Sequence, residues 1–198
     1  MPAEDRLANS PFAQFQLWMA DAEQSEPNDP NAMSVATVSA DLRPSVRIVL
    51  LKAVDDRGFI FYTNKDSRKG DELGGNPSAA LLFHWKSLQR QVRIEGTVES
   101  VADADADAYF ASRPRISRLG AWASRQSRPL QNRALLQQRL AETETRYPDA
   151  IPRPPYWSGY RVLPVVFEFW QDMPFRLHDR TVYRADDRGT WVQAKLFP

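Results

Sequence analysis

The chain is dominated by short apolar runs that alternate with turn-forming residues, and this pattern restricts the fold more than any other feature. Met33–Ser39 alternates apolar and polar side chains, and Ser45–Ala53 has an apolar centre at Ile48–Leu51. Similar runs are Phe59–Thr63, Ala79–Trp85, Gln91–Val101, Arg161–Trp170, Arg176–Tyr183 and Thr190–Leu196. Such runs, bounded by Gly, Pro and Asp, are typical of strands joined by turns. The sequence therefore predicts a mainly β protein with added helices, in the form of a small β-barrel.

Helical periodicity is confined to segments outside these runs. Phe12–Ala22 repeats its aromatic residues at helical spacing, and we expect this stripe to pack on the body of the protein. Asp103–Ser112 begins with a candidate Asp cap and ends before Pro114, and Asn132–Tyr147 is amphipathic. The proline-rich stretch Pro148–Pro155 cannot continue a helix, so we expect an extended connection there.

We expect a single domain over residues 1–198, because the proline-rich link is too short to mark a domain boundary. The expected parts are an N-terminal helix and loop at 1–32, barrel strands at 33–101, a helical insert at 102–147 and C-terminal strands at 156–198.

The composition excludes several classes of protein. Hydrophobic residues make up 42% and charged residues 26%, an ordinary globular balance that argues against disorder. The net charge of +1 supplies no global field for nucleic acid, so no nucleic-acid partner is expected. There is no cysteine, no apolar run near the ~20 residues of a membrane helix, and no apolar signal-peptide core in the first ten residues. We therefore expect a cytoplasmic protein with no membrane partner.

Arg47 and Lys52 stand at the two ends of one apolar run. Residues five apart point to opposite faces of a regular strand. The two cations can serve one site only if the strand ends or bulges between them. The alternative is two exposed charges that flank a buried strand.

The segment Tyr62–Lys69 joins a strand end to a short helix that a serine could cap and that Gly74–Gly75 would end. Its first helical residues are Arg68 and Lys69. Helix N-termini bind phosphate readily, whereas cations there are unfavourable unless an anion is present. A phosphate site and a solvated polar turn both remain open for this segment.

Tyr109, Arg113 and Ser117 recur every four residues, and the first two would share one face of a helix that Pro114 ends. Two hydroxyls and a guanidinium suit a phosphate group. The alternative is a helix end with an exposed arginine.

Arg176, His178 and Arg180 alternate along an expected strand and would therefore lie on one face. Three potentially cationic groups side by side repel one another unless an anion or an electron-rich ring lies over them. This arrangement favours a functional site over a structural histidine.

The common nucleotide and hydrolase motifs are absent from the sequence. There is no glycine-rich dinucleotide fingerprint, no P-loop and no G-x-S-x-G elbow. Two separated histidines without cysteine also give no reason to expect a metal site.

Taken together, the motifs resemble the pyridoxamine/pyridoxine 5′-phosphate oxidase family over nearly the whole chain. The resemblance is carried, in order, by Arg47–Lys52, Phe61–Asn64 with Ser67–Lys69, Arg90–Val92, Tyr109–Phe110, Ser112–Arg115, Gly120–Trp122, Gln126–Ser127, Trp157–Arg161, Glu168–Gln171 and Arg176–Arg180. It implies an FMN-binding split β-barrel with flanking helices that forms a homodimer, with FMN at the subunit interface.

The resemblance also implies a set of site residues. The implied FMN-binding residues are Arg47, Ile48, Val49, Leu50, Leu51, Lys52, Tyr62, Thr63, Arg68, Lys69, Gln91, Gln126, Ser127, Trp170 and Arg180. The implied substrate-binding residues are Lys52, Tyr109, Arg113, Ser117, Arg176, Leu177 and His178, of which Arg176 and His178 would be catalytic.

The implied activity is oxidation of pyridoxamine 5′-phosphate and pyridoxine 5′-phosphate to pyridoxal 5′-phosphate, as part of pyridoxine biosynthesis. Hydride passes from substrate C4′ to the flavin, O2 is the acceptor and H2O2 is produced. Two alternatives remain: a related flavin oxidase of another aromatic metabolite, such as a phenazine precursor, and a non-catalytic protein that binds flavin or a B6 phosphate.

Overall fold

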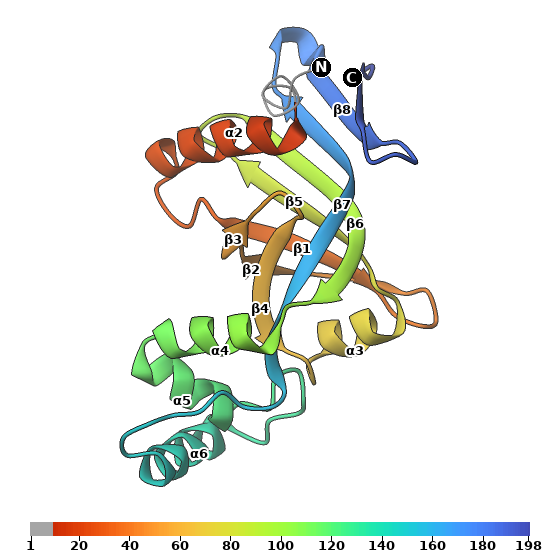
Figure 1. The fold of residues 1–198 in the computed structure, drawn as a ribbon. Helices are drawn as coiled ribbons and strands as arrows, with labels where there is room; N and C mark the ends of the chain where they lie inside the picture. Colours follow the sequence, from red (N-terminus) through yellow and green to blue (C-terminus); the bar gives the residue numbers. More distant parts are fainter. Residues whose placement is uncertain (1–9) are drawn as a thin grey trace.

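The structure, a computed structural model, describes residues 10–198. The expectation that the first ten residues form no signal-peptide core therefore falls almost wholly outside the described part. Within that part, nine strands form one curled antiparallel sheet, flanked by helices (Figure 1). The predicted mainly β, barrel-type fold is confirmed.

The elements follow one another along the chain with short connections. The strands are β1 (Ala32–Val38), β2 (Pro44–Leu50), β3 (Ala53–Val54), β4 (Phe59–Asn64), β5 (Ser78–Trp85), β6 (Arg90–Ser100), β7 (Trp157–Gln171), β8 (Asp179–Ala185) and β9 (Trp191–Lys195). The helices are α2 (Pro11–Ser25), α3 (Arg68–Gly75), α4 (Asp103–Ser112), α5 (Arg115–Ala123), α6 (Arg133–Arg146) and the 3₁₀ turn η1 (Pro174–Arg176). The sheet order is β2-β1-β5-β6-β7-β4-β3, and β8 pairs with β7 and β9.

The long strand β7 connects the two parts of the sheet because its halves have different partners. Its first half pairs with β4 and its second half with β8, while β6 runs along its other edge. The β6–β7 register shifts between Glu95 and Gly96. A Cβ atom at Gly96 would lie 2.1 Å from the carbonyl oxygen of Leu163, so this close approach requires glycine. The shift lets β7 leave β4 and continue beside β8.

Helix α2 covers the main core, as the aromatic stripe predicted. Ser10 caps the helix by accepting a hydrogen bond from the backbone N–H of Ala13. The buried ring of Phe15 lies edge-on to Phe59 and Phe83, with centroids 4.8 and 5.0 Å away. These edge-to-face contacts fix the helix on the sheet.

Helices α4, α5 and α6 lie beyond the end of the sheet that is opposite to α2 and the C-terminus (Figure 1). The sequence predicted two helices in this region, and α5 was missed. Pro114 ends α4, but it is also the N-cap residue of α5, so a single proline separates two helices. The cap of α4 is Ala102 rather than the predicted aspartate. Asp103 and Asp107 remain exposed, and both form ion pairs with Arg153 of the proline-rich connection.

Candidate active site

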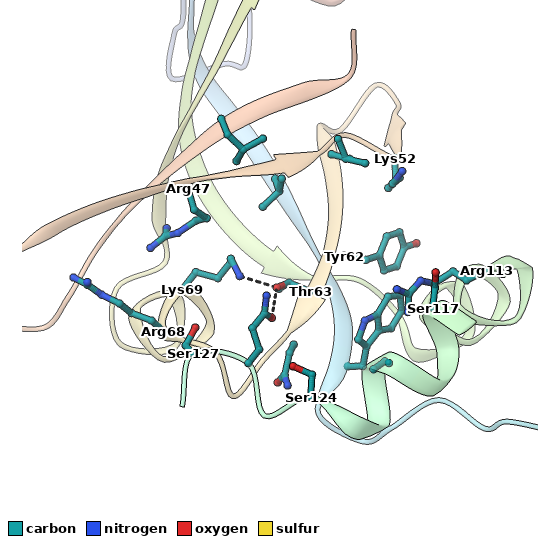
Figure 2. A pocket seen from close by; sticks show the side chains of 18 of the residues that line it. Arg47, Lys52, Tyr62, Thr63, Arg68, Lys69, Arg113, Ser117, Ser124 and Ser127 are labelled. Carbon is teal, nitrogen blue, oxygen red and sulfur yellow. Dashed lines mark hydrogen bonds between the residues drawn. The ribbon is translucent and has the colours of Figure 1, made fainter. Parts of the chain in front are cut away.

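A cavity of about 820 Å³ opens between the end of the sheet and the helices α3, α4 and α5 (Figure 2). Its lining includes the cation pair Arg47 and Lys52, the cation pair Arg68 and Lys69, and all of Tyr109, Arg113 and Ser117. The predicted site residues that line it are Arg47, Ile48, Val49, Leu50, Lys52, Tyr62, Thr63, Arg68, Lys69, Tyr109, Arg113, Ser117, Gln126 and Ser127. Segments far apart in the sequence therefore meet in one space.

Arg47 and Lys52 reach this cavity together because the predicted continuous strand 45–53 is wrong. β2 ends at Leu50 and β3 begins at Ala53. In between, the N–H of Leu51 donates to Asn31 and the N–H of Lys52 donates to Ile60, so the chain leaves β1 and joins β4. This change of partner removes the strict alternation of a strand.

The N-terminus of α3 presents a buried lysine to the cavity. Lys69 is 6% exposed, and its Nζ donates to the hydroxyls of Thr63, at 3.0 Å, and Ser67, at 3.4 Å. Burial, reinforced by the nearby Arg47 guanidinium, lowers the pKa of Lys69. Ser67 occupies the cap position, but its hydroxyl donates to the Asn64 carbonyl and does not cap the helix as predicted.

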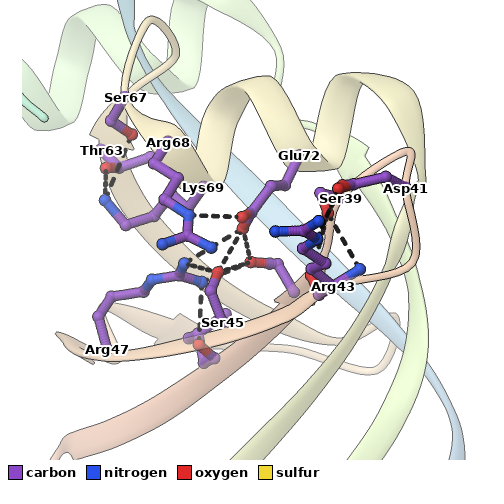
Figure 3. Close-up of polar contacts among 12 residues, drawn as sticks. Ser39, Asp41, Arg43, Ser45, Arg47, Thr63, Ser67, Arg68, Lys69 and Glu72 are labelled. Carbon is purple, nitrogen blue, oxygen red and sulfur yellow. Dashed lines mark hydrogen bonds and ion pairs between the residues drawn. The ribbon is translucent and has the colours of Figure 1, made fainter. Parts of the chain in front are cut away.

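A buried carboxylate, Glu72, organises the cations of this region (Figure 3). One of its oxygens accepts from Nε of Arg68 at 2.8 Å, and the other accepts from Thr37, from Ser45 and from Arg47. Burial alone would raise the pKa of Glu72, but these hydrogen bonds outweigh it and lower the pKa to about 2. The carboxylate is therefore ionised and orients both arginines.

The charges near α3 fit a phosphate group. Arg47, Arg68 and Lys69 supply three positive charges and Glu72 one negative charge, which leaves two positive charges. A phosphate monoester carries about −1.5 to −2 at neutral pH, so it would balance this excess. Phosphate would also face the N-terminal N–H groups of α3, which favour an anion.

Aromatic rings form the opposite wall. The Tyr62 ring is stacked with Tyr109, with centroids 4.0 Å apart, and with Trp157, at 5.3 Å, and the rings of Tyr109 and Trp157 are themselves 6.1 Å apart. The Arg113 guanidinium lies 4.8 Å from the Trp157 ring. Flat walls of this kind suit a planar ligand.

Arg113 has a buried donor atom without a partner. Burial lowers its pKa, and within residues 10–198 its Nη1 atom is buried without a hydrogen-bond partner. A buried cation without an acidic partner is costly unless a ligand supplies the charge. Tyr109 belongs to α4, Arg113 is the residue after α4 and Ser117 belongs to α5, so Ser117 lies beyond Pro114 on a second helix.

The remaining predicted residues form a second group around β8. Gln91 pairs with Trp170, and Trp170 pairs with Arg180 across β6, β7 and β8. Arg176, Leu177 and His178 precede β8, which lies toward the end of the sheet that is opposite to α4, α5 and α6 (Figure 1). None of these residues lines the large cavity. Leu51 is absent from its lining as well, because it packs into the core.

The expectation that Arg176, His178 and Arg180 alternate on one strand is wrong. β8 begins at Asp179, and Arg176 lies in the 3₁₀ turn η1. Phe175 and Arg176 both have φ of 60°, so the backbone folds back before the strand starts. Arg180 is held by Glu168, and His178 packs on Trp170.

Sequence reasoning missed several residues of the cavity wall. The Arg113 guanidinium lies over the Trp157 ring. The other lining residues that were not predicted are Ser45, Val46, Asn64, Gly120, Ala121 and Ser124. Trp157 begins the motif Trp157–Arg161, but no local sequence pattern indicates that the first residue of a strand will stack on Tyr62.

An open antiparallel barrel with a cationic, aromatic-walled cavity is suited to a planar phosphorylated ligand. Residues 19–147 match the family model described as pyridoxamine 5′-phosphate oxidase, and residues 157–198 match the pyridoxine 5′-phosphate oxidase C-terminal dimerisation region. The chain belongs to the pyridoxamine 5′-phosphate oxidase family, and FMN is the cofactor of this family.

Individual relatives agree with this assignment. The chain is 62% identical over 193 residues to the pyridoxine/pyridoxamine 5′-phosphate oxidase of Gluconobacter oxydans, and the aligned region covers 97% of this chain and 96% of the relative. It is 59% identical over 201 residues to that of Rhodospirillum rubrum, covering 98% of each.

Solved structures share the fold. PhzG from Burkholderia lata 383, in complex with tetrahydrophenazine-1-carboxylic acid, superposes with a TM-score of 0.91 at 33% identity, covering 100% of this chain and 97% of that one. An FMN-binding protein from Nostoc punctiforme superposes with a TM-score of 0.77 at 17% identity, covering 96% and 98%. The predicted split barrel is thereby confirmed. In residues 10–198, no helix is long and apolar enough to cross a membrane.

Proposed function

We propose that this chain is an FMN-dependent oxidase that converts pyridoxine 5′-phosphate and pyridoxamine 5′-phosphate to pyridoxal 5′-phosphate. The observation that carries the proposal is the presence of two separate anion-suited groups in one cavity, one around α3 and one at Arg113. A cofactor phosphate and a substrate phosphate account for both. We also propose that residues 1–198 belong to one domain and that the protein acts in the cytoplasm.

The group around α3 would hold the phosphate of FMN. Arg68 and Lys69 would supply charge, and Thr63, Gln126 and Ser127 would supply polar contacts around it. The four η protons of Arg47 are already directed to Val35, Thr37, Ser45 and Glu72, so Arg47 supports the site mainly as a fixed charge. FMN, when bound, supplies the two-electron acceptor that no amino-acid side chain can provide.

The group on α4 and α5 would hold the substrate phosphate. Arg113 would offer its Nη1, Ser117 and Tyr109 would offer hydroxyls, and Lys52 would add a cation from the segment between β2 and β3. Binding energy from this remote phosphate orients the reacting C4′ carbon, which raises the rate of the chemical step.

A homodimer would bring the two groups of site residues together. The chain matches the family's dimerisation region over residues 157–198, which contains Trp170, Arg176, His178 and Arg180. In a single chain these residues do not line the cavity. We therefore propose that FMN lies at the subunit interface, between the cavity of one subunit and the β8 region of its partner.

The overall reaction balances with oxygen as the acceptor. Pyridoxine 5′-phosphate and O2 give the aldehyde and H2O2, and pyridoxamine 5′-phosphate additionally takes up water and releases ammonia. Arg176 would orient the substrate ring and favour loss of a proton from the C4′ hydroxyl or amine. His178 would accept or share that proton.

Anaerobic reduction tests the proposal directly. The purified protein should be yellow, and pyridoxine 5′-phosphate added without oxygen should bleach the flavin absorbance, which returns with air and yields peroxide. A protein that binds both compounds yet never bleaches would be the non-catalytic alternative.

The similarity to PhzG keeps a phenazine-precursor oxidase as a second candidate. The same bleaching assay with unphosphorylated pyridoxine and with tetrahydrophenazine-1-carboxylic acid separates the two. Because Arg113 has an unpartnered buried donor, we expect the phosphorylated B6 substrate to react fastest by a wide margin.

A further inference from the structure

The Arg113 guanidinium lies over aromatic rings rather than beside an acid. Its Cζ atom is 4.8 Å from the centroid of the Trp157 ring and 5.6 Å from that of the Phe110 ring. Burial lowers the pKa of Arg113 and Tyr109 partly offsets this, while no carboxylate of residues 10–198 contributes. The Nη1 atom is buried without a hydrogen-bond partner in the same part of the chain. The buried charge therefore depends on the rings for its stabilisation.

A ring face stabilises a cation without cancelling its charge. The negative charge density above an aromatic ring attracts a cation, and among the natural side chains tryptophan does so most strongly. A carboxylate in the same place would neutralise Arg113 and repel a phosphate. In the group around α3, by contrast, Glu72 pairs with two arginines and still leaves an excess of positive charge. With a single cation at Arg113, only an uncharged partner leaves a charge for the ligand.

The backbone fixes both partners of this contact. A residue before proline is disfavoured in helical backbone, and Arg113, which precedes Pro114, is extended, with φ of −72° and ψ of 148°. Trp157 is the first residue of β7, opposite Asn64 of β4, and is 6% exposed. Its ring lies edge-on to that of Phe110, with centroids 5.0 Å apart. The indole is therefore held by contacts that do not involve Arg113, and it can determine where the guanidinium lies.

We propose that Trp157 is a positioning residue that holds the Arg113 guanidinium in the cavity wall and keeps its charge available to the substrate phosphate. The assignment of that phosphate to Arg113 rests on the proposed function. Trp157 acts through Arg113 and not by contact with the phosphate. Weakening its ring face should therefore impair binding of the phosphorylated end of the substrate and leave the FMN content unchanged.

Site-specific replacement of Trp157 by mono-, di- and trifluorinated tryptophan tests the contact with little change in the shape of the ring. Each fluorine withdraws electron density from the ring face and so weakens its attraction for a cation. In steady-state assays of the holoenzyme, KM for pyridoxine 5′-phosphate should rise stepwise, to about tenfold with three fluorines. The kcat value and the KM for unphosphorylated pyridoxine should change little.

A double-mutant cycle shows whether Trp157 acts through Arg113. Trp157→Phe keeps a weaker ring face and should raise KM for pyridoxine 5′-phosphate roughly three- to fivefold. Combined with Arg113→Ala, the same change should have little further effect, because the two residues act as one unit. Trp18→Phe is the matched control: the Trp18 ring lies 4.6 Å from the Arg90 guanidinium, outside the cavity, and its replacement should leave KM unchanged.

A KM that is the same for all the fluorinated proteins overturns the proposal. So does a Trp157→Phe effect that persists undiminished without Arg113. If the wild type shows no turnover, the proposed function fails, and titration calorimetry with pyridoxine 5′-phosphate then compares the same proteins by Kd. A Kd that rises with fluorination supports the role of Trp157, whereas a constant Kd, or no binding by the wild type, overturns it.

Discussion

Gly159 on β7 lies directly opposite Tyr62 on β4, and its lack of a side chain makes room for the Tyr62 ring. The two residues are partners in the β4–β7 register. A Cβ atom at Gly159 would lie 2.8 Å from Cε1 and 2.9 Å from Cδ1 of Tyr62. Because Tyr62 stacks on Tyr109 in the cavity wall, the absence of a side chain at Gly159 sets the position of both rings.

Gly159→Ala should therefore displace the Tyr62 ring and disturb the cavity. Overpacking of this kind costs about 1–3 kcal/mol. We expect a lower Tm and a raised KM for pyridoxine 5′-phosphate. Gly74→Ala is the control, since nothing lies within 4 Å of a Cβ at that exposed helical glycine. Equal behaviour of the two variants would contradict the steric role of Gly159.

Arg68→Ala combined with Lys69→Ala should weaken FMN binding. Each loss removes a hydrogen bond to a charged group, worth roughly 1.5–3 kcal/mol, so the Kd should rise about 100-fold or more. Fluorescence titration of the apoprotein with FMN measures it. Lys65→Ala, an exposed lysine in the same loop, should leave the Kd unchanged. A double variant that stays fully yellow through purification would rule out the α3 phosphate site.

Arg113→Ala should act on the substrate and spare the cofactor. Loss of one charge-assisted hydrogen bond should raise KM for pyridoxine 5′-phosphate roughly 10- to 100-fold. The preference for phosphorylated over unphosphorylated pyridoxine should shrink by a similar factor. Steady-state kinetics measures both, with the exposed Arg133→Ala as control. An unchanged KM would remove Arg113 from the phosphate site.

Arg176→Ala and Arg176→Met should keep FMN but lose most turnover. If Arg176 promotes loss of the substrate proton, kcat/KM should fall at least about 100-fold. The flavin absorbance of the purified variant reports cofactor content independently. Arg188→Ala, in the exposed turn after β8, is the control. Near-normal kcat/KM in the Arg176 variants would show that this residue is not catalytic.

Glu72 predicts a specific acid sensitivity. Its pKa is lowered to about 2 in the folded protein from an ordinary value of 4.5. The ionised carboxylate therefore stabilises the fold fully above pH 4.5, and this contribution is lost as the pH falls toward 2. The shift corresponds to about 3 kcal/mol at most.

Glu72→Gln should accordingly be less stable than the wild type near neutral pH, with the difference shrinking below pH 4.5. Thermal unfolding of both apoproteins across this range measures the difference. A gap that stays constant down to pH 3 would show that the Glu72 charge does not stabilise the fold. Glu144→Gln, on the exposed part of α6, should show no such gap at any pH.

Local patterns in the sequence were enough to predict most of the strands, the helix α2 with its buried stripe, and the groups of residues suited to anions. These features depend on periodicity and on charges close together in the chain, so local reasoning finds them. Even the resemblance to an FMN-dependent oxidase family came from short motifs in order along the chain.

Which of these groups meet depends on how segments distant in the sequence fold together. Arg47 and Lys52 share a cavity because the chain between them stops pairing with β1 and begins pairing with β4. Arg113 and Ser117 line the same cavity although Pro114 separates α4 from α5. Arg176 and His178 lie instead at the far end of the sheet, before β8. Pairing between distant strands follows from which faces are buried together, and no window of sequence contains that information.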